Sequence, residues 1–504
     1  MQPADAIVAI ATAPGKGGVG VLRFSFPSRS GAGSALESLP ECLPEFLQFC
    51  QAFCFGHAAP PADAESTLAD SVSSELISAE SSKSPFLKPR HATLIRVKDS
   101  QQHLIDEGIA LVFPAPHSFT GEHVLEFQGH GGSGVLQAVL GRALEVAREL
   151  DIPLRHAQAG EFTQRAFLNG KLDLAQAEAV ADLIDASSAS AVKAAAASLS
   201  GVFSERVTRL ADQITHLRLL LEATLDFPEE EIDFLEKADA KGQLKSILDT
   251  FSLLLQAAQE GVKFRDGLQV VLVGQPNVGK SSLLNALAGE DIAIVTPVAG
   301  TTRDRIKQDL NIRGIPMVLV DTAGLRQTQD EVEQIGIERT QKSILEADLV
   351  IHLIDSSQPP CPVDDGIRKS MPNGLPILTV FNKADLVSEF SETSNAVLSL
   401  DAHVSVSAKT GLGLEKLKDE ILRLAHITHT PDHGFMARQR HVDALKRCGQ
   451  HLDMASEYAQ QDDRILDLFA EELRLAHDSL GEITGRMLPD DLLGLIFSRF
   501  CIGK

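Results

Sequence analysis

The sequence is short of basic residues. Lys and Arg total 46, against 69 Asp and Glu, so the net charge at pH 7 is −23. A field of this sign repels nucleic acid, which argues against a broad nucleic-acid-binding surface. Any RNA substrate would therefore need a local basic patch or a basic partner.

Cysteine pairs, a targeting segment and a membrane span are also missing. The six cysteines are scattered and form no C-x-x-C pair, so neither a zinc site nor a disulfide framework is expected. Residues 1–10 lack the basic region of a secretory signal and the Arg/Ser-rich composition of a transit peptide. No apolar run approaches the ~20 residues of a membrane helix. We therefore expect a cytoplasmic protein with buried, reduced thiols. For Cys501, at an apolar helix end, the sequence favours a buried structural thiol over a chemical role.

The length of 504 residues predicts about three domains. Residues 1–151 mix short apolar runs with turn signals, which predicts an α+β domain with a helix at 136–150 and strands at 7–10, 20–24 and 109–113. Within it, Ser, Ala, Pro and acidic residues dominate positions 57–91. Because this composition cannot bury enough apolar surface to order itself, we expect a flexible insertion there.

Residues 152–265 are rich in Ala and Leu and predict a helical domain. Two apolar stripes recur at helical spacing: Leu174, Ala177, Ala181 and Ile184, then Val207, Leu210, Ile214, Leu217 and Leu221. The second helix should end near Asp226, because Pro228 cannot continue it.

Residues 266–426 alternate strands with helices. Four strands read as near-continuous apolar runs, at 268–273, 317–320, 349–354 and 377–381. Such runs are typical of a parallel sheet covered on both faces. Residues 427–504 are helical again. The predicted fold class is therefore multidomain α/β and α, with an N-terminal α+β domain and an α/β domain inserted into a helical one.

A phosphate-binding loop follows the first of these strands. Residues 274–281 read Gly-Gln-Pro-Asn-Val-Gly-Lys-Ser, which matches G-x-x-x-x-G-K-[ST]. Three further segments follow in the order of a guanine-nucleotide switch: Gly300-Thr301-Thr302-Arg303-Asp304, Asp321-Thr322-Ala323-Gly324 and Asn382-Lys383-Ala384-Asp385. Four ordered segments predict that the inserted domain is a P-loop GTPase domain.

The first segment contacts the phosphates. Backbone N–H groups of residues 277–280, which include Val278 and Gly279, point at them, helped by the N-terminus of the helix that carries Ser282. Lys280 reaches the β- and γ-phosphates. Ser281, and Thr302 in the next segment, are the candidate Mg²⁺ ligands.

The third segment is expected to contact the γ-phosphate and to lie near the attacking water. Asp321 polarises the water shell of the metal, and Gly324 donates its N–H to the γ-phosphate. Leu325 stands where many small GTPases carry a water-orienting Gln, so another group must position the water. Glu331 and Glu333 follow, and spacing alone leaves open whether either does more than face solvent.

The fourth segment selects guanine. Asp385 accepts hydrogen bonds from N1–H and the exocyclic amine of guanine, and adenine would leave this carboxylate unpaired. The expected fifth segment is Ser407-Ala408-Lys409, with the Ala408 N–H facing guanine O6.

These segments, together with motifs over nearly the whole chain, resemble the bacterial tRNA-modification GTPases of the MnmE (TrmE) family. The further motifs are Ala13-Pro14-Gly15-Lys16-Gly17-Gly18-Val19-Gly20, Ser118-Phe119-Thr120-Gly121-Glu122, Gln128-Gly129-His130-Gly131-Gly132, Gly160-Glu161-Phe162-Thr163, Arg165-Ala166-Phe167-Leu168-Asn169-Gly170-Lys171-Leu172-Asp173-Leu174, Asp490-Asp491-Leu492-Leu493-Gly494 and Phe500-Cys501-Ile502-Gly503-Lys504.

The resemblance implies that residues 1–151 bind a tetrahydrofolate derivative (5-formyl- or 5,10-methylene-tetrahydrofolate) and dimerise. Residues 152–265 and 427–504 form the helical domain, and residues 266–426 the GTPase domain. A homodimer would join an FAD-containing partner, MnmG or GidA, in a heterotetramer. Together they add an aminomethyl-type group, such as carboxymethylaminomethyl, to carbon 5 of the wobble uridine of tRNA, using a folate one-carbon unit. K⁺-dependent GTP hydrolysis would bring the GTPase domains together.

The resemblance also implies roles for single residues. Glu333 matches the acid that orients water. The loop Thr296-Pro297-Val298-Ala299 joins the GTP site, and the K⁺ ligands match Asn277, Thr296, Val298 and Thr301. The folate-contacting positions match Arg23, Glu126, Lys171 and Lys504. The segment 57–91 is the main departure from the family pattern, and we expect a surface excursion that leaves the fold intact.

Without the family resemblance, these residues also allow purely structural interpretations. Arg23 and Glu126 would form an ordinary ion pair, and Lys171 and Lys504 would be surface charges. Arg303 is either an arginine finger or a solvated charge.

Two other functions use the same nucleotide motifs. An assembly GTPase that binds ribosomal RNA usually brings a Lys/Arg-rich module, which is missing here. A folate-dependent one-carbon transferase would use its nucleotide domain only for regulation. Loss of tRNA modification in a Glu333→Ala variant that still binds GTP fits only the family interpretation.

Overall fold

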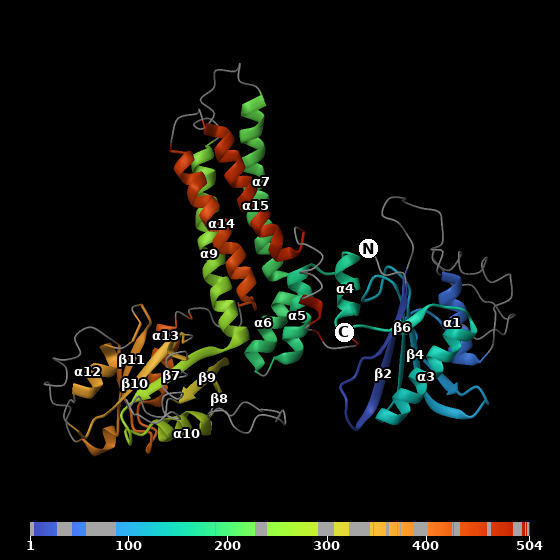
Figure 1. The fold of residues 1–504 in the computed structure, drawn as a ribbon, viewed down its shortest axis with the longest axis horizontal. Coiled ribbons are helices and arrows are strands. Elements are labelled where there is room, and N and C mark those ends of the chain that lie inside the picture. Colours follow the sequence, from blue (N-terminus) through green and yellow to red (C-terminus); the bar gives the residue numbers. More distant parts are fainter. Residues whose placement is uncertain are drawn as a thin grey trace, which may run out of the picture. The chain divides into compact units, whose positions relative to one another are not determined.

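The structure is a computed structural model, and it describes residues 5–27, 43–56, 87–186, 188–226, 239–290, 307–321, 343–345, 347–358, 362–369, 371–372, 374–387, 402–425, 427, 434–460, 465–486, 496–498, 500 and 503. The chain divides into two compact units. The first contains residues 1–177 and 488–504, and the second contains residues 178–487. Each unit contains one six-stranded sheet (Figure 1).

The first sheet has the strand order β3-β4-β5-β2-β1-β6. Neighbouring strands are antiparallel except for β1 and β6, which are parallel. The predicted strands at 7–10, 20–24 and 109–113 are confirmed. The strands are β1 (Ala6–Ile10), β2 (Gly17–Phe26), β3 (Thr93–Lys98), β4 (Leu104–Phe113), β5 (His123–Gly131) and β6 (Leu154–His156).

The helices α1 (Leu43–Phe55) and α3 (Ser133–Glu149) cover one face of this sheet (Figure 1). Leu22, Phe24 and Phe26 of β2 pack in this core. Because side chains alternate along a strand, Arg23 and Ser25 point to the opposite face. There α4 (Glu161–Leu168) adds Phe162 to a small apolar cluster with β1. One face of the sheet is therefore an apolar core, and the other carries polar side chains.

Segments far from the sheet in sequence also belong to this unit. Phe497 packs against Phe167 of α4, with ring centroids 6.1 Å apart. Gly503 has φ 96°, and a Cβ on it would lie 2.5 Å from Ile10 O, so its backbone approaches the end of β1 closely. Of the predicted insertion, 57–86 lie outside the described residues. Its end is tied to β4, since the Arg90 N–H donates to Val112 O at 2.8 Å.

Long helices dominate one part of the second unit. The helix α7 contacts α9 and α15, and α14 contacts the same two, so the four lie side by side (Figure 1). The helices are α6 (Ala189–Leu199), α7 (Val202–Asp226), α9 (Ala240–Asp266), α14 (Gln439–Tyr458) and α15 (Leu466–Thr484), with α5 (Leu174–Asp185) divided between the two units.

The predicted stripe from Val207 to Leu221 is confirmed, because all five residues are buried, and α7 ends at Asp226 as expected. The first stripe is right only in part. Leu174 and Ala177 are buried, but Ile184 is 43% exposed. The second half of α5 instead turns Glu178 and Asp182 inward, where arginines pair with them.

The second sheet has the order β12-β11-β10-β7-β9-β8, and only the pair β8–β9 is antiparallel. Apolar clusters cover both faces, which confirms the multidomain fold class with a mostly parallel sheet. The strands are β7 (Leu268–Gly274), β8 (Lys307–Ile312), β9 (Ile315–Asp321), β10 (Leu349–Asp355), β11 (Ile377–Asn382) and β12 (His403–Ser405); the helices are α10 (Lys280–Glu290), α12 (Pro362–Lys369), the 3-10 turn η1 (Ala384–Leu386) and α13 (Leu414–Leu424).

The four-domain boundaries derived from the sequence stay a prediction. Among the helices of the described residues, none combines the length and the apolar character that crossing a membrane requires.

A buried ionic cluster joins α5 to the helices of the second unit. Arg440 donates from Nε and Nη2 to the two carboxylate oxygens of Glu178, each at 2.8 Å. His441 Nε2 lies 2.9 Å from Glu178 Oε2. Burial would raise the pKa of Glu178, but its bonds to His441 and Arg440 outweigh burial and hold the pKa below the ordinary value. Asp182 accepts from Arg265 of α9 at 2.9 Å.

We predict that Glu178→Ala lowers the free energy of unfolding of this unit by about 3–5 kcal/mol, because it removes a buried carboxylate and leaves the half-buried Arg440 and the buried His441 without their acid. Because folding lowers the pKa of Glu178, its stabilisation is present above the ordinary value of 4.5 and is lost as pH falls through the folded value. Urea unfolding at pH 7 and in acid checks both points. The control is Glu205→Ala, which removes an exposed pair with Arg209 and should cost less than about 1 kcal/mol. Equal losses in the two variants would contradict the prediction.

Candidate functional site

The loop between β7 and α10 turns sharply through residues with positive φ. Asn277 has φ 64° and Gly279 has φ 96°. Such turns let successive backbone N–H groups converge on one point, which makes an anion-binding concavity. A Cβ at Gly279 would lie 2.3 Å from Asn382 Nδ2, so only glycine fits there. The loop thus has the backbone form that phosphate binding needs.

Lys280 is held across this loop. Its Nζ donates to Gly274 O at 2.9 Å and to Gln275 O at 3.0 Å. The ammonium group therefore lies over the loop instead of extending into solvent. Ser281 and Ser282 follow in the first turn of α10, where both are exposed.

Asn382 joins the loop to the guanine-selecting segments. It is 2% exposed, and its Nδ2 donates to Val278 O at 2.8 Å. Its Oδ1 accepts from the Ala408 N–H at 3.1 Å. The structure thus brings three predicted segments together through one side chain. The Ala408 N–H, predicted to face guanine O6, here donates to Asn382.

Lys383 is fixed by an acid that the sequence analysis missed. Its Nζ lies 2.6 Å from Asp355 Oδ2. Burial raises the pKa of Asp355, but hydrogen bonds from Lys383 and Ser357 outweigh it and leave the pKa below its ordinary value. The available signal was an acid that ends an apolar strand at the carboxyl edge of a parallel sheet, where ligands bind.

The carboxylate of Asp385 is also fixed. Ser407 Oγ donates to Asp385 Oδ1 at 2.6 Å, and Ser407 Oγ accepts from the Thr410 N–H at 3.2 Å. Lys409 continues the same turn, and Ala384 N donates to Val406 O at 3.1 Å. A carboxylate with a defined direction can read the adjacent N1–H and amine donors of guanine.

The switch positions lie outside the described residues. Asp321 ends β9, but only its backbone is described. The other residues predicted for the switch segments lie at 291–306 and 322–342, outside the described residues: Thr296, Pro297, Val298, Ala299, Gly300, Thr301, Thr302, Arg303, Thr322, Ala323, Gly324, Leu325, Glu331 and Glu333. Their roles stay predictions.

A second candidate site lies on the polar face of the first sheet. Arg23 Nε donates to Glu126 Oε1 at 2.8 Å, and the Arg23 guanidinium lies 5.6 Å from the Phe119 ring centre. The ion pair between Arg23 and Glu126, which the sequence analysis kept as an alternative to folate contact, is therefore present. The two side chains are 23% and 15% exposed, so a ligand can still reach them.

Lys171 lies beside the loop that carries Phe119. A Cβ on Gly121, which has φ 78°, would lie 3.4 Å from Lys171 Cγ. Lys171 is exposed. Three of the four candidate folate residues thus gather around residues 118–122. The fourth, Lys504, lies outside the described residues, although Gly503 before it packs on Ile10.

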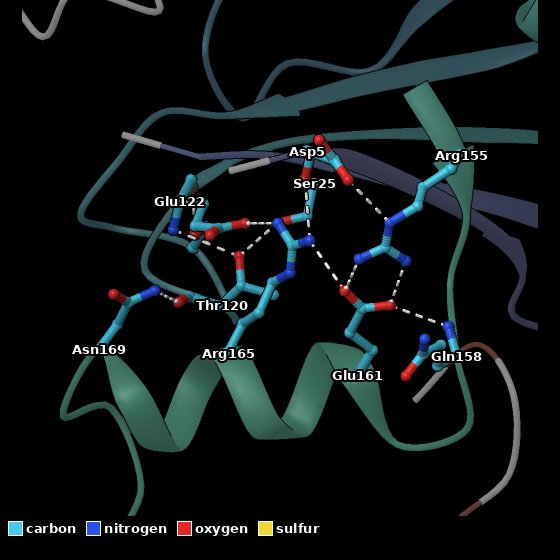
Figure 2. Close-up of polar contacts among 10 residues, drawn as sticks. Asp5, Ser25, Thr120, Glu122, Arg155, Gln158, Glu161, Arg165 and Asn169 are labelled. Carbon is cyan, nitrogen blue, oxygen red and sulfur yellow. Dashed lines mark hydrogen bonds and ion pairs between the residues drawn. The ribbon is translucent and has the colours of Figure 1, made fainter. Parts of the chain in front are cut away.

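A buried arginine ties this loop to α4 (Figure 2). Arg165 is 1% exposed and donates to Glu122 Oε2 and to Glu161 Oε1, both at 2.9 Å. Ser25 Oγ donates to the same Glu122 oxygen at 2.7 Å. Figure 2 also shows Asn169 donating to Thr120 O, at 2.7 Å. The loop at 118–122 is therefore fixed from β2 and from the C-terminal half of α4.

Glu161 is the second carboxylate of this network. Arg155 binds it through both Nη atoms, at 2.8 and 2.6 Å, and the Gln158 N–H donates to it at 2.8 Å (Figure 2). Burial would raise the pKa of Glu161, but these bonds and Arg165 outweigh it and lower the pKa to about 2. The sequence analysis assigned no role to Arg165 or Glu161. Their i,i+4 spacing on a helix was the available signal.

Comparison with known proteins identifies the family. Residues 174–501 match the model of the MnmE helical domain, and residues 66–171 match that of the GTP-binding protein TrmE N-terminus. A tRNA modification GTPase MnmE of Bordetella parapertussis is 50% identical over 498 residues, 99% of each chain. One of Burkholderia orbicola is 49% identical over 501 residues, again 99% of each. The chain belongs to the MnmE family of tRNA modification GTPases.

This membership confirms the resemblance and the predicted enzyme class, a GTP hydrolase. Among solved structures, a variant of Aquifex aeolicus Era bound to GDP·AlF4⁻ is 29% identical. It covers 36% of this chain and 65% of its own, with a TM-score of 0.27, which is too low to support an inference.

We predict that Asn382→Ala weakens GDP binding at least about tenfold, because it leaves the Val278 C=O and the Ala408 N–H without their partner. Equilibrium titration with a fluorescent GDP analogue measures this loss. Lys416→Ala, an exposed residue of α13 in the same unit, should bind as the wild type does. Unchanged binding by Asn382→Ala would show that the two loops hold their positions without this side chain.

Proposed function

We propose that the protein binds Mg²⁺·GTP at the loop between β7 and α10, and that GTP hydrolysis there drives modification of the wobble uridine of tRNA. The observation that carries this proposal is the buried Asn382, which joins the phosphate loop to the guanine-selecting segments. Family membership supports tRNA as the substrate of the complex.

The chain's own residues bind and orient the nucleotide in this proposal. The N–H groups of residues 277–280 receive the phosphates, and Lys280 neutralises charge on the β- and γ-phosphates. Since Lys280 is already held over the loop, little further ordering is needed on binding. Asp385, fixed by Ser407, selects guanine.

The ions complete the site. Ser281 and Thr302 would hold Mg²⁺, near Asp321, and Asn277 with Thr296, Val298 and Thr301 would hold K⁺. When bound, the two ions supply positive charge to the phosphate oxygens, the role an arginine finger has in other GTPases. The turn at Asn277, with φ 64°, exposes its side chain at the mouth of the loop and fits this assignment. Glu333 orients the attacking water, a task that Leu325 cannot perform.

The first unit supplies folate binding in this proposal. Arg23, Glu126 and Lys171, with Lys504, would hold a 5-formyl- or 5,10-methylene-tetrahydrofolate, which would supply the one-carbon unit that is added at carbon 5 of the uridine. Arg23 and Glu126 present a donor and an acceptor side by side, which suits the pairing edge of a pterin. The protein acts in the cytoplasm as a homodimer with the FAD-containing MnmG (GidA) in a heterotetramer.

We predict that GTP hydrolysis by the purified chain rises at least about tenfold when K⁺ replaces Na⁺ at the same ionic strength, since K⁺ supplies charge to the phosphates. Asn277→Ala should remove this rise. Phosphate release in the two salts measures it. Equal, slow rates in both salts would contradict the K⁺ mechanism, and a GTPase awaiting an external activator would then be the better account.

We predict that Glu126→Gln weakens binding of 5-formyl-tetrahydrofolate at least about tenfold, because a neutral amide loses the charge-assisted hydrogen bonds of the carboxylate. Isothermal titration of the full chain measures the affinity. Glu107→Gln is a matched control, since Glu107 pairs with Arg96 on the same sheet but is exposed. Equal affinities for wild type and both variants would leave Arg23 and Glu126 as an ion pair only.

A further inference from the structure

Gln275, in the phosphate-binding loop, is held from outside the loop. Its side-chain Nε2 donates to Asp364 Oδ2 at 2.9 Å. Asp364 lies on α12 and belongs to none of the nucleotide motifs. The contact joins two segments that are 89 residues apart in the sequence.

The surroundings of Asp364 fix its position over the loop. Three residues further along α12, Ile367 packs on an apolar cluster that contains Val271, Val273 and Val350. From β10, His352 places Nε2 3.5 Å from Asp364 Oδ1, and its side chain is 4% exposed. Asp364 is therefore confined by its own helix and by the strand next to β7.

The backbone of Gln275 in turn holds Lys280. Gln275 O accepts from Lys280 Nζ at 3.0 Å, beside the bond from Lys280 to Gly274 O. Fixing the Gln275 side chain restricts rotation of its backbone, and therefore the direction of this carbonyl. A chain of two hydrogen bonds thus runs from Asp364 to the lysine that faces the phosphates.

We propose that Asp364 is a positioning residue for the nucleotide phosphates, which acts through Gln275 on Lys280. The inference rests on the proposed GTP site. A lysine that is already oriented loses less side-chain freedom when phosphate binds, so affinity for the β-phosphate rises. Asn382 and Asp385 are held by other groups, namely Val278, Ala408 and Ser407, so we expect guanine recognition to change much less than binding of the β-phosphate.

The test measures binding of GDP and of GMP to the full chain, by competition with a fluorescent GDP analogue. Gln275→Ala, Asp364→Ala and the double variant are compared with the wild type. Each single variant should bind GDP about three- to tenfold more weakly, the loss of one hydrogen bond, and GMP within about twofold of the wild type. The double variant should be no weaker than either single one, because the residues act in one chain.

Two further variants separate positioning from a general disturbance. Asp364→Asn keeps an oxygen acceptor and should restore GDP binding. Lys369→Ala changes an exposed residue of the same helix and should bind GDP as the wild type does. Losses that multiply in the double variant, equal losses for GMP and GDP, or unchanged GDP binding would each overturn the inference. A wild-type chain that binds no GDP would overturn the proposed GTP site, and the inference with it.

Discussion

The nucleotide site depends on one buried amide. Asn382 ends β11, and both polar groups of its side chain bond to other loops. Its amide N–H donates to Val278 O, and its amide oxygen accepts from the Ala408 N–H. A backbone C=O and a backbone N–H that are removed from water need partners, and an amide is a side chain that serves one of each. The missing Cβ of Gly279 makes room for it. Phosphate recognition and guanine recognition are therefore set at one relative position by the fold.

In the first unit, a buried network of charged side chains fixes the position of a loop. Arg165, Glu122 and Glu161 are buried on the face of the sheet opposite its apolar core. Buried charges are costly unless each is paired and hydrogen-bonded, and here Arg155, Ser25 and a backbone N–H complete the set (Figure 2). The network holds residues 118–122 in a fixed position beside Arg23 and Lys171. Its geometry matters more than any net stabilisation, because apolar residues of similar volume would stabilise the same face at least as well.

Sequence patterns predicted those features that depend on local order. Apolar runs located β7, β9, β10 and β11, and the motif at 274–281 placed the phosphate loop between a strand and a helix. Contacts between distant segments were harder to predict. A salt bridge such as Lys383–Asp355 leaves no periodic signal in the sequence, and the available hint was only that Asp355 ends an apolar strand. The same holds for α5, where spacing favoured Ile184 as a core residue but arginines on other helices drew Glu178 and Asp182 inward.

The start of the strand β9 is held by two helices. Ile315, at its start, is buried in an apolar cluster with residues of α6 and with Phe264 of α9. Ser188, the N-cap of α6, donates to Gly314 O at 3.1 Å in the turn before it. The other end of β9 is Asp321, in the segment that the sequence assigns to the γ-phosphate. Packed interiors resist gradual deformation. If Asp321 changes position, either β9 stays in place and only the residues after it move, or β9 shifts as a whole and displaces α6 and α9.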